Sequence, residues 1–355
     1  MYDRISLFFF RGCVYFMKKT TSILLVLCLL LTVASLSSCG KEGDITGYGD
    51  TVSIVGRAVP TFTVAETGDF TVLQFTDTHF ISGSTKKDEK TLAAMRAQID
   101  AKKPDLVVIS GDMVEGKNAS LSYNKQAVLE TVGKMFEEMQ QYWAYVPGNN
   151  DGEVSGSTAD VTAFLAQYKY CIESNAENLT GVTQYAVDLY DANQNLVHCL
   201  LFMDSLARDA DNNYDYMKAD QVQWAKDTIA AKKAENPNVT VSVFFHMNTP
   251  NFANAGKSGT AYSVDCAPIP ADFYEGIDGN APLDAVFQEA GCVGLVSIGH
   301  IHPDTNYCSF YKNTYYQVVR SSGFSVADAP GCALITIHTA ASSVQDMYDF
   351  EDIAF

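Results

Sequence analysis

The sequence has few basic residues, no repeated unit and no closely paired cysteines. Lys and Arg number 24 against 42 Asp and Glu, which gives a formal net charge of −18 at pH 7. A nucleic-acid-binding surface needs clustered Lys and Arg to displace counterions, so the composition argues against this class. No repeat with a period of roughly 20 to 50 residues is visible, which argues against solenoids and propellers. None of the nine cysteines has CxxC spacing, and we predict no zinc-thiolate site.

The N-terminus is predicted to be an export signal rather than part of the fold. Lys18 and Lys19 precede the apolar run Ile23–Val33, which is too short to span a bilayer comfortably. Small residues follow, and Leu36–Cys39 resembles the lipobox of bacterial lipoproteins. That resemblance implies a lipid on Cys39 and an exported protein anchored to a membrane of the cell envelope or cell surface. An uncleaved anchor or an ordinary secretory signal is the alternative.

Three segments are therefore expected along the chain. Residues 1–39 contain an N-terminal extension before Met17 and then the lipoprotein signal that ends at Cys39. Residues 40–68 are rich in glycine and are predicted to be a tether. Residues 69–355 are expected to form one domain, and 47% hydrophobic residues is enough for a substantial core.

Six cysteines remain after the predicted signal: Cys171, Cys199, Cys266, Cys292, Cys308 and Cys332. In an oxidising compartment these thiols could pair. Cys199 and Cys332 lie in apolar runs, where a buried free thiol is an equally good interpretation.

From Phe70 onward, short apolar runs alternate with helical stretches. Strands are expected at Thr71–Phe75, Leu106–Ile109, Tyr142–Val146, Leu196–Met203, Val239–Phe245 and Val293–Ile298. Helices are expected at Glu89–Lys102, Gln126–Gln140, Ala219–Lys233 and Pro282–Ala290. Beyond Gly299, tyrosine-rich alternation at Tyr307–Val319 and a strand at Leu334–His338 indicate a second sheet. The predicted fold class is α/β (an α+β sandwich), with two mixed sheets packed face to face and flanked by helices.

Side chains that bind metals follow the ends of five predicted strands. They are Asp77 and His79, Asp112, Asn149, His246, and the pair His300 and His302. Sites in such folds gather past the carboxyl ends of strands. Two metal ions need about four protein ligands each, with one carboxylate bridging both, and this set supplies the right donors. The other histidines, His198 and His338, lie inside predicted strands and are expected to pack or form hydrogen bonds.

The order of these elements, D-x-H, G-D, G-N, H and G-H-x-H, resembles the calcineurin-like metallophosphoesterase family. The surrounding sequence is similar to a branch related to purple acid phosphatases, and the resemblance covers Phe70 to Val319. It implies hydrolysis of a phosphate mono- or diester, or anhydride, of a small molecule by a hydroxide held between two ions of Mn, Zn or Fe. It also implies the ligand sets Asp77, His79 and His302 for one ion, Asn149, His246 and His300 for the other, and Asp112 as the bridge.

Two positions depart from this family pattern. The histidine that follows the asparagine ligand is replaced by Asn150, which precedes the expected acid Asp151. An amide can bind a phosphate oxygen but cannot donate a proton as an acid at neutral pH. Asn150, and Asp151 through a water, are therefore predicted to supplement catalysis, with turnover of alkyl monoesters weakened most. The alternative is a lipoprotein whose metal site binds a phosphate ligand or a partner without efficient turnover. Glu115 stands where purple enzymes have a tyrosine ligand, so no iron-tyrosinate colour is expected.

Overall fold

The computed structural model describes residues 53–116, 124–153, 157–261, 265–274 and 276–355. The predicted signal and Cys39 lie outside these residues. Within the described ranges, no helix combines the length and the apolar character needed to cross a membrane.

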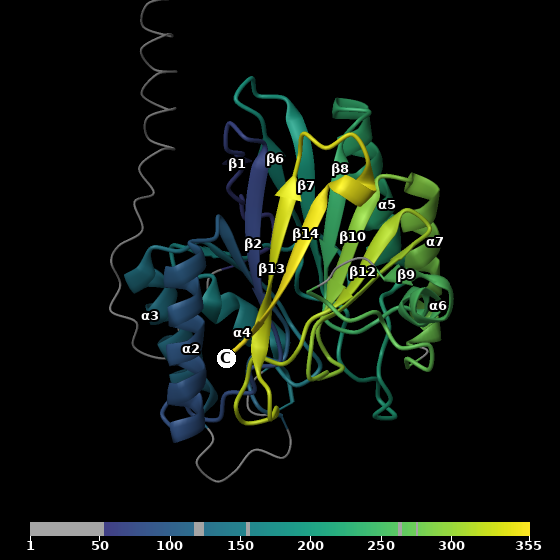
Figure 1. Ribbon diagram of the computed structural model, residues 1–355. Helices are drawn as coiled ribbons and strands as arrows, with labels where there is room; N and C mark the ends of the chain where they lie inside the picture. The colour runs from purple at the N-terminus through teal and green to yellow at the C-terminus, as the bar shows by residue number, and fades with distance from the viewer. Residues whose placement is uncertain (1–52, 117–123, 154–156, 262–264, 275) are drawn as a thin grey trace, which may run out of the picture. The chain divides into compact units, whose positions relative to one another are not determined.

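Two mixed β-sheets with flanking helices make up the described part of the chain, which confirms the predicted sandwich (Figure 1). The larger sheet has the strand order β1 (Phe62–Thr63), β6 (Gln184–Tyr190), β7 (Leu196–Met203), β8 (Thr240–Phe244), β10 (Val293–Ile298), β12 (Thr314–Val318), β11 (Tyr307–Tyr311) and β9 (Thr260–Ala261). The smaller sheet has the order β14 (Tyr348–Ala354), β13 (Gly331–His338), β2 (Asp69–Phe75), β3 (Leu106–Ser110), β4 (Trp143–Val146) and β5 (Cys171–Ile172).

The two sheets share one apolar core. Val72 of β2 and Ile335 of β13 belong to the same buried cluster as Phe202 of β7 and Phe244 of β8. The rings of Phe202 and Phe244 stack with centroids 5.3 Å apart. Burying this many apolar side chains between the sheets is the main stabilising contribution to the sandwich.

Helices cover the outer faces of the sheets, and Figure 1 shows α2 and α3 on one side and α5 and α7 on the other. They are α2 (Lys86–Lys102), α3 (Lys125–Met139), α4 (Thr158–Leu165), α5 (Ala219–Glu235), α6 (Pro250–Ser258) and α7 (Ala281–Ala290). The four predicted helices are confirmed as α2, α3, α5 and α7. A second apolar cluster joins α5, α6 and α7 to the larger sheet through Ile229, Phe252 and Leu283.

The predicted division of strands between the sheets is wrong. β12 pairs in parallel with β10, so the tyrosine-rich strands continue the larger sheet instead of starting a new one. The smaller sheet is built on β2, β3 and β4, and β13 joins it by pairing antiparallel with β2. Apolar strands in either sheet have similar local sequences, and only long-range pairing decides which sheet each strand joins.

The predicted tether, residues 40–68, is described only from residue 53. Within this part, β1 pairs in parallel with β6, and Ile54 and Val64 are buried. The tether prediction is therefore wrong for these residues, which belong to the domain. The prediction rested on glycine content, but most glycines of residues 40–68 precede β1.

The six cysteines whose pairing the sequence left open are all free and buried. Each lies on or beside a strand or in the packed interior, where a thiol behaves as a small apolar side chain.

Candidate metal centre

The carboxyl ends of neighbouring parallel strands bring the predicted ligands to one edge of the sandwich. β2, β3 and β4 pair in parallel in the smaller sheet, as do β8 and β10 in the larger sheet. The loops after these strands carry the seven predicted ligands, Asp77, His79, Asp112, Asn149, His246, His300 and His302. Parallel strands end at the same edge of a sheet, so residues distant in sequence converge there.

Six of the seven side chains form two groups that could each hold a metal ion. One group is Asp77, His79, Asp112 and His302, and the other is Asp112, His246 and His300, with the ligand atoms of each group within 4.8 Å of one another. Asp112 belongs to both groups. A carboxylate has two oxygens, so this position is suited to bridge two ions.

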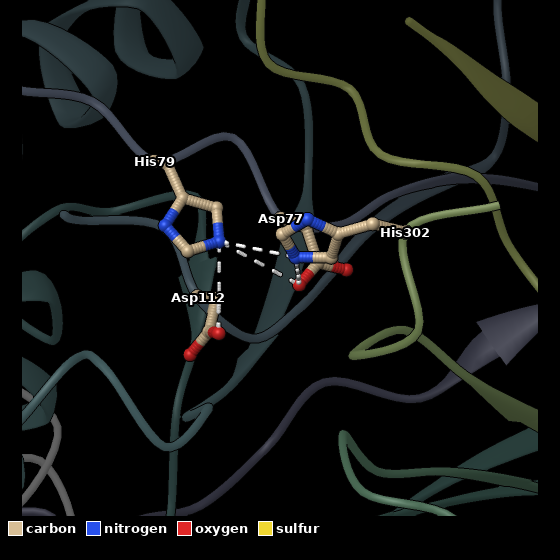
Figure 2. Close-up of side chains that lie close together, drawn as sticks. All are labelled: Asp77, His79, Asp112 and His302. Atoms are coloured by element: carbon tan, nitrogen blue, oxygen red, sulfur yellow. Dashed lines mark hydrogen bonds and ion pairs between the residues drawn. The ribbon is translucent and has the colours of Figure 1, made fainter. Parts of the chain in front are cut away.

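Ring nitrogens and carboxylate oxygens of the first group point toward one another (Figure 2). His302 Nε2 lies 2.9 Å from Asp77 Oδ1 and 3.3 Å from His79 Nε2. His79 Nε2 also lies 3.7 Å from Asp112 Oδ2. Imidazole and carboxylate donors in this mixture suit Zn, Fe or Mn.

Whether these residues fit metal ions can be judged from buried polar atoms that lack hydrogen bonds. His246 Nδ1 donates to the carbonyl of Ser110 at 2.8 Å, which leaves Nε2 as the lone-pair nitrogen, 3.2 Å from Asp112 Oδ2. His246 Nε2 and Asn149 Oδ1 are both buried, and neither has a hydrogen-bond partner among the described residues. Burying such atoms unpaired is costly, and metal ions would satisfy both of them. The residues therefore fit a metal pair.

The electrostatics of the cluster depend on its opposite charges. Burial would lower the pKa of His246, but the charges of Asp112 and Asp77 raise it to about 9. Burial would raise the pKa of Asp112, but His246 and His79 hold it below its usual value. Burial and the neighbouring His246 lower the pKa of His300 to about 4. Cation binding would therefore release protons from the cluster, because a protonated imidazole cannot act as a ligand.

Five of the predicted ligands have left-handed backbone conformations. Their φ angles are +49° at Asp77, +43° at His79, +49° at Asp112, +70° at His300 and +52° at His302. Such conformations cost on the order of 1–3 kcal/mol each and persist where the surrounding structure holds them. Here the amide of Asp77 donates to the Gly111 carbonyl at 3.0 Å, and the amide of His79 donates to the Asp112 carbonyl at 3.1 Å. The strain is concentrated where the side chains converge.

The two predicted catalytic residues lie in the loop after β4 and have different hydrogen-bond partners. Asn150 is half-buried and donates to both oxygens of Asp112, from its backbone amide at 2.7 Å and from its side-chain amide at 2.6 Å. Asp151 is fully buried, and its oxygens accept from the amides of Val114 at 3.0 Å and Gly148 at 2.7 Å. Asn150 thus touches the shared carboxylate, whereas Asp151 holds the shape of the loop.

Three residues outside the predicted ligand set contact the predicted ligands. Thr76 Oγ1 donates to Asp77 Oδ2 at 2.8 Å. Glu115 Oε2 lies 3.4 Å from His79 Nδ1, and Tyr214 has its ring centroid 4.9 Å from that of His300. Adjacency to Asp77 was an available signal for Thr76, and nearness to Asp112 was one for Glu115. No sequence signal linked Tyr214 to His300, because the two are distant along the chain.

The two remaining histidines lie outside both metal-binding groups. His198 is buried, with Nδ1 2.6 Å from Thr240 Oγ1 and Nε2 2.9 Å from Ser242 Oγ. His338 lies 2.8 Å from Asp69 and 3.0 Å from Asp349. Both have the packing and hydrogen-bonding roles that their strand positions predicted.

Known proteins resemble this chain in sequence. Residues 70–304 match the family described as Calcineurin-like phosphoesterase. The chain is 23% identical to "Probable inactive purple acid phosphatase 28" of Arabidopsis thaliana, over 70% of this chain and 69% of that protein. It is 24% identical to "Phosphatase DCR2" of Saccharomyces cerevisiae, over 68% of this chain but only 45% of the yeast protein.

A solved structure also has this fold. A dimetal phosphatase from Danio rerio superimposes with a TM-score of 0.50 and 12% identity, covering 80% of this chain and 98% of that chain. The family match spans the five strand-end elements, and purple acid phosphatase homologues are among the relatives. This chain therefore belongs to the calcineurin-like phosphoesterase family.

Proposed function

We propose that this protein is a metal-dependent phosphohydrolase that cleaves a phosphate mono- or diester, or a phosphoanhydride, of a small molecule. The observation that carries the proposal is that two groups of metal-binding side chains share Asp112. When bound, a pair of Mn, Zn or Fe ions would supply an activated water and offset charge on the phosphoryl oxygens. The family supports hydrolysis, and the geometry supports two ions.

The proposed ligands are Asp77, His79 and His302 for one ion, Asn149, His246 and His300 for the other, and Asp112 between them. His246 is oriented by the Ser110 carbonyl, which fixes the tautomer that a ligand needs. Asn150 orients Asp112 and offers an amide to a phosphate oxygen, but it cannot protonate a leaving group. Asp151 contributes through the shape of its loop, because its carboxylate is occupied by two backbone amides.

A second candidate function is binding of a phosphate ligand, or of a partner, without efficient turnover. Asn150 in place of the family histidine favours it, and two Arabidopsis relatives carry the word "inactive" in their names. We favour hydrolysis because the shared-carboxylate geometry is intact, and metal ions provide much of the catalysis in such sites.

Cleavage of p-nitrophenyl phosphate and bis-p-nitrophenyl phosphate separates the two candidates. The purified protein would be stripped of metal, then reloaded with Mn²⁺, Zn²⁺ or Fe²⁺. Hydrolysis that depends on one of these ions supports the phosphohydrolase. Retention of metal together with binding of inorganic phosphate, but no cleavage of either ester, supports the binding function. His338→Gln is the matched control, since it removes a histidine outside both groups.

We further propose that the protein is exported and anchored to a membrane by lipid on Cys39, so that its substrate is extracytoplasmic. The proposal rests on the lipobox-like sequence before Cys39. Labelling cells with radioactive palmitate tests it. Label on the wild-type protein and none on Cys39→Ser supports the anchor, whereas equal labelling of both would contradict it.

A further inference from the structure

A small hairpin between β7 and α5 carries Arg208 and Tyr214 beside the candidate metal centre. The two residues face each other across an antiparallel bridge. The Tyr214 ring meets the His300 ring edge-on, at an interplanar angle of 87°. The guanidinium of Arg208 lies 4.3 Å from the centroid of the Tyr214 ring. The ring of Tyr214 therefore lies between the positive charge of Arg208 and the proposed metal ligand His300.

Three contacts hold the Arg208 guanidinium in place. Besides the ring of Tyr214, Nε donates to Glu153 Oε1 at 3.2 Å and Nη1 donates to the Asn212 carbonyl at 3.1 Å. These hydrogen bonds use Nε and Nη1 and not Nη2, and the side chain is 27% exposed. Arg208 is therefore immobilised, reachable from solvent and left with spare donors.

Glu153 connects Arg208 to Asn150, which replaces the family histidine. A Cβ placed on Gly116 would collide with both Asn150 Oδ1 and Glu153 Oε2, so these two oxygens are close neighbours. Asn150 in turn binds Asp112. Glu153 thus links the guanidinium to Asn150, which stands at the position of the family histidine.

A cavity of about 350 Å³ adjoins the same guanidinium. Gly148, Asp204, Arg208 and Asp215 are among its lining residues, and Arg208 is the basic side chain in the lining. The carboxylate of Asp204 is already hydrogen-bonded, because its oxygens accept from the amides of Val182 and Leu206. Asp215 forms an ion pair with Lys218. The volume is in the range of small-ligand pockets. Gly148 in its lining directly precedes the proposed ligand Asn149, so the cavity is placed to receive the part of a substrate that lies beyond the reacting phosphorus.

We infer that Arg208, supported by Tyr214, binds the departing phosphate of a phosphoanhydride, which makes anhydrides the preferred substrate class. The inference rests on the proposed phosphohydrolase function. An alkoxide leaving group needs a general acid, which Asn150 is not, whereas a phosphate departs without one. The planar guanidinium is suited to phosphate oxygens.

The reaction balances without a co-reactant. Water adds its oxygen to the attacked phosphorus, and the bond from that phosphorus to the bridging oxygen breaks. The electron pair of this bond stays on the departing phosphate, where Arg208 offsets the added charge. The proton from water is released to solvent.

Comparison of ADP with p-nitrophenyl phosphate tests the inference, because only ADP has a phosphate in its leaving group. Arg208→Gln should lower kcat/KM for ADP by about 10- to 100-fold, the range for losing a charge-assisted hydrogen bond, and change that for p-nitrophenyl phosphate by less than about threefold. Arg96→Gln, which removes an exposed arginine paired with Glu138, should change neither. Tyr214→Ala removes the ring beside the guanidinium and should also lower kcat/KM for ADP.

The outcomes separate failure of the inference from failure of the proposed function. Equal losses for both substrates, or no loss for ADP, would overturn the role of Arg208. If the wild type hydrolyses neither substrate, calorimetric titration of the Mn²⁺-loaded protein with methylenediphosphonate decides the inference, and the proposed function fails only if bis-p-nitrophenyl phosphate is not cleaved either. Binding at least about tenfold weaker to Arg208→Gln supports it, since one charge-assisted contact is worth that factor, and equal binding overturns it.

Discussion

The side-chain amide of Asn150 donates a 2.6 Å hydrogen bond to Asp112 Oδ2, on the carboxylate shared by both metal-binding groups. The backbone amide of Asn150 donates to the other oxygen, Oδ1, at 2.7 Å. The residue that replaces the family histidine is therefore fixed at the centre of the site. It supplies hydrogen-bond donors there but no titratable proton.

Restoring the histidine should restore acid catalysis. Asn150→His is expected to raise kcat for an alkyl phosphate monoester by about 10²- to 10⁴-fold, because poor leaving groups depend on a general acid. The change for p-nitrophenyl phosphate should be much smaller, since p-nitrophenolate leaves readily without a proton. Steady-state kinetics on the two esters check this. Equal acceleration of both would show that the residue acts on something other than the leaving group.

Removing the charge of Glu115 should weaken metal binding. Its Oε2 lies 3.4 Å from His79 Nδ1, the ring nitrogen that faces away from the other ligands. Carboxylates in this position orient a histidine ligand and increase its basicity, and their loss costs about 10- to 100-fold in metal affinity. Competition with a chelator would measure the affinity of Glu115→Gln. The control is Glu289→Gln, in an exposed pair with Lys226, which should retain wild-type affinity.

A methyl group on Gly299 should disrupt the first metal-binding group. A Cβ there would collide with Thr76 Oγ1 and Asp77 Oδ2. Asp77 Oδ2 also accepts from the His300 amide at 2.9 Å, so the collision displaces a proposed ligand. Overpacking of this kind costs about 1–3 kcal/mol. Gly299→Ala should show that loss in urea unfolding and a reduced metal content; unchanged metal content would contradict the close packing at this turn.

Buried His198 should make the fold sensitive to acid. Burial lowers its pKa to about 3, from an ordinary value of 6.5. The unfolded chain therefore takes up a proton near pH 6.5 while the folded chain does not, so stability is full above that pH and falls as the pH drops toward 3. By pH 5 the loss is about 2 kcal/mol.

Urea unfolding of wild type and His198→Gln at pH 7 and pH 5 isolates this contribution. Glutamine keeps a polar side chain for Thr240 and Ser242 but does not titrate in this range. The variant should lose about 2 kcal/mol less than the wild type between the two pH values. Parallel losses would mean that His198 is not the group responsible.

Much of the site was predictable because its ligands follow strand ends. Asp77, Asp112 and His246 each come after an apolar run long enough to identify as a strand, and parallel strands bring such positions together. The partners of these side chains were not predictable. Ser110 contributes a backbone carbonyl to His246, and any residue can do that.

The fold class was predictable from strand and helix periodicity, but the partition of strands was not. Nothing in the local sequences of β12 and β13 names their neighbours, yet β12 joins β10 and β13 joins β2. The hairpin of Arg208 and Tyr214 was likewise hidden, because its position beside His300 depends on tertiary packing and not on local sequence. Long-range contacts are the part of the structure that local patterns do not encode.

The metal content and activity of Asp112→Asn test the central claim most directly. Asp112 is the side chain that both groups share, so one substitution should impair both ions. The account predicts that wild-type protein binds two metal ions per chain and hydrolyses p-nitrophenyl phosphate, bis-p-nitrophenyl phosphate or ADP. It predicts that Asp112→Asn, folded by circular dichroism, loses at least one ion and all measurable hydrolysis. Two retained ions with wild-type hydrolysis would contradict it.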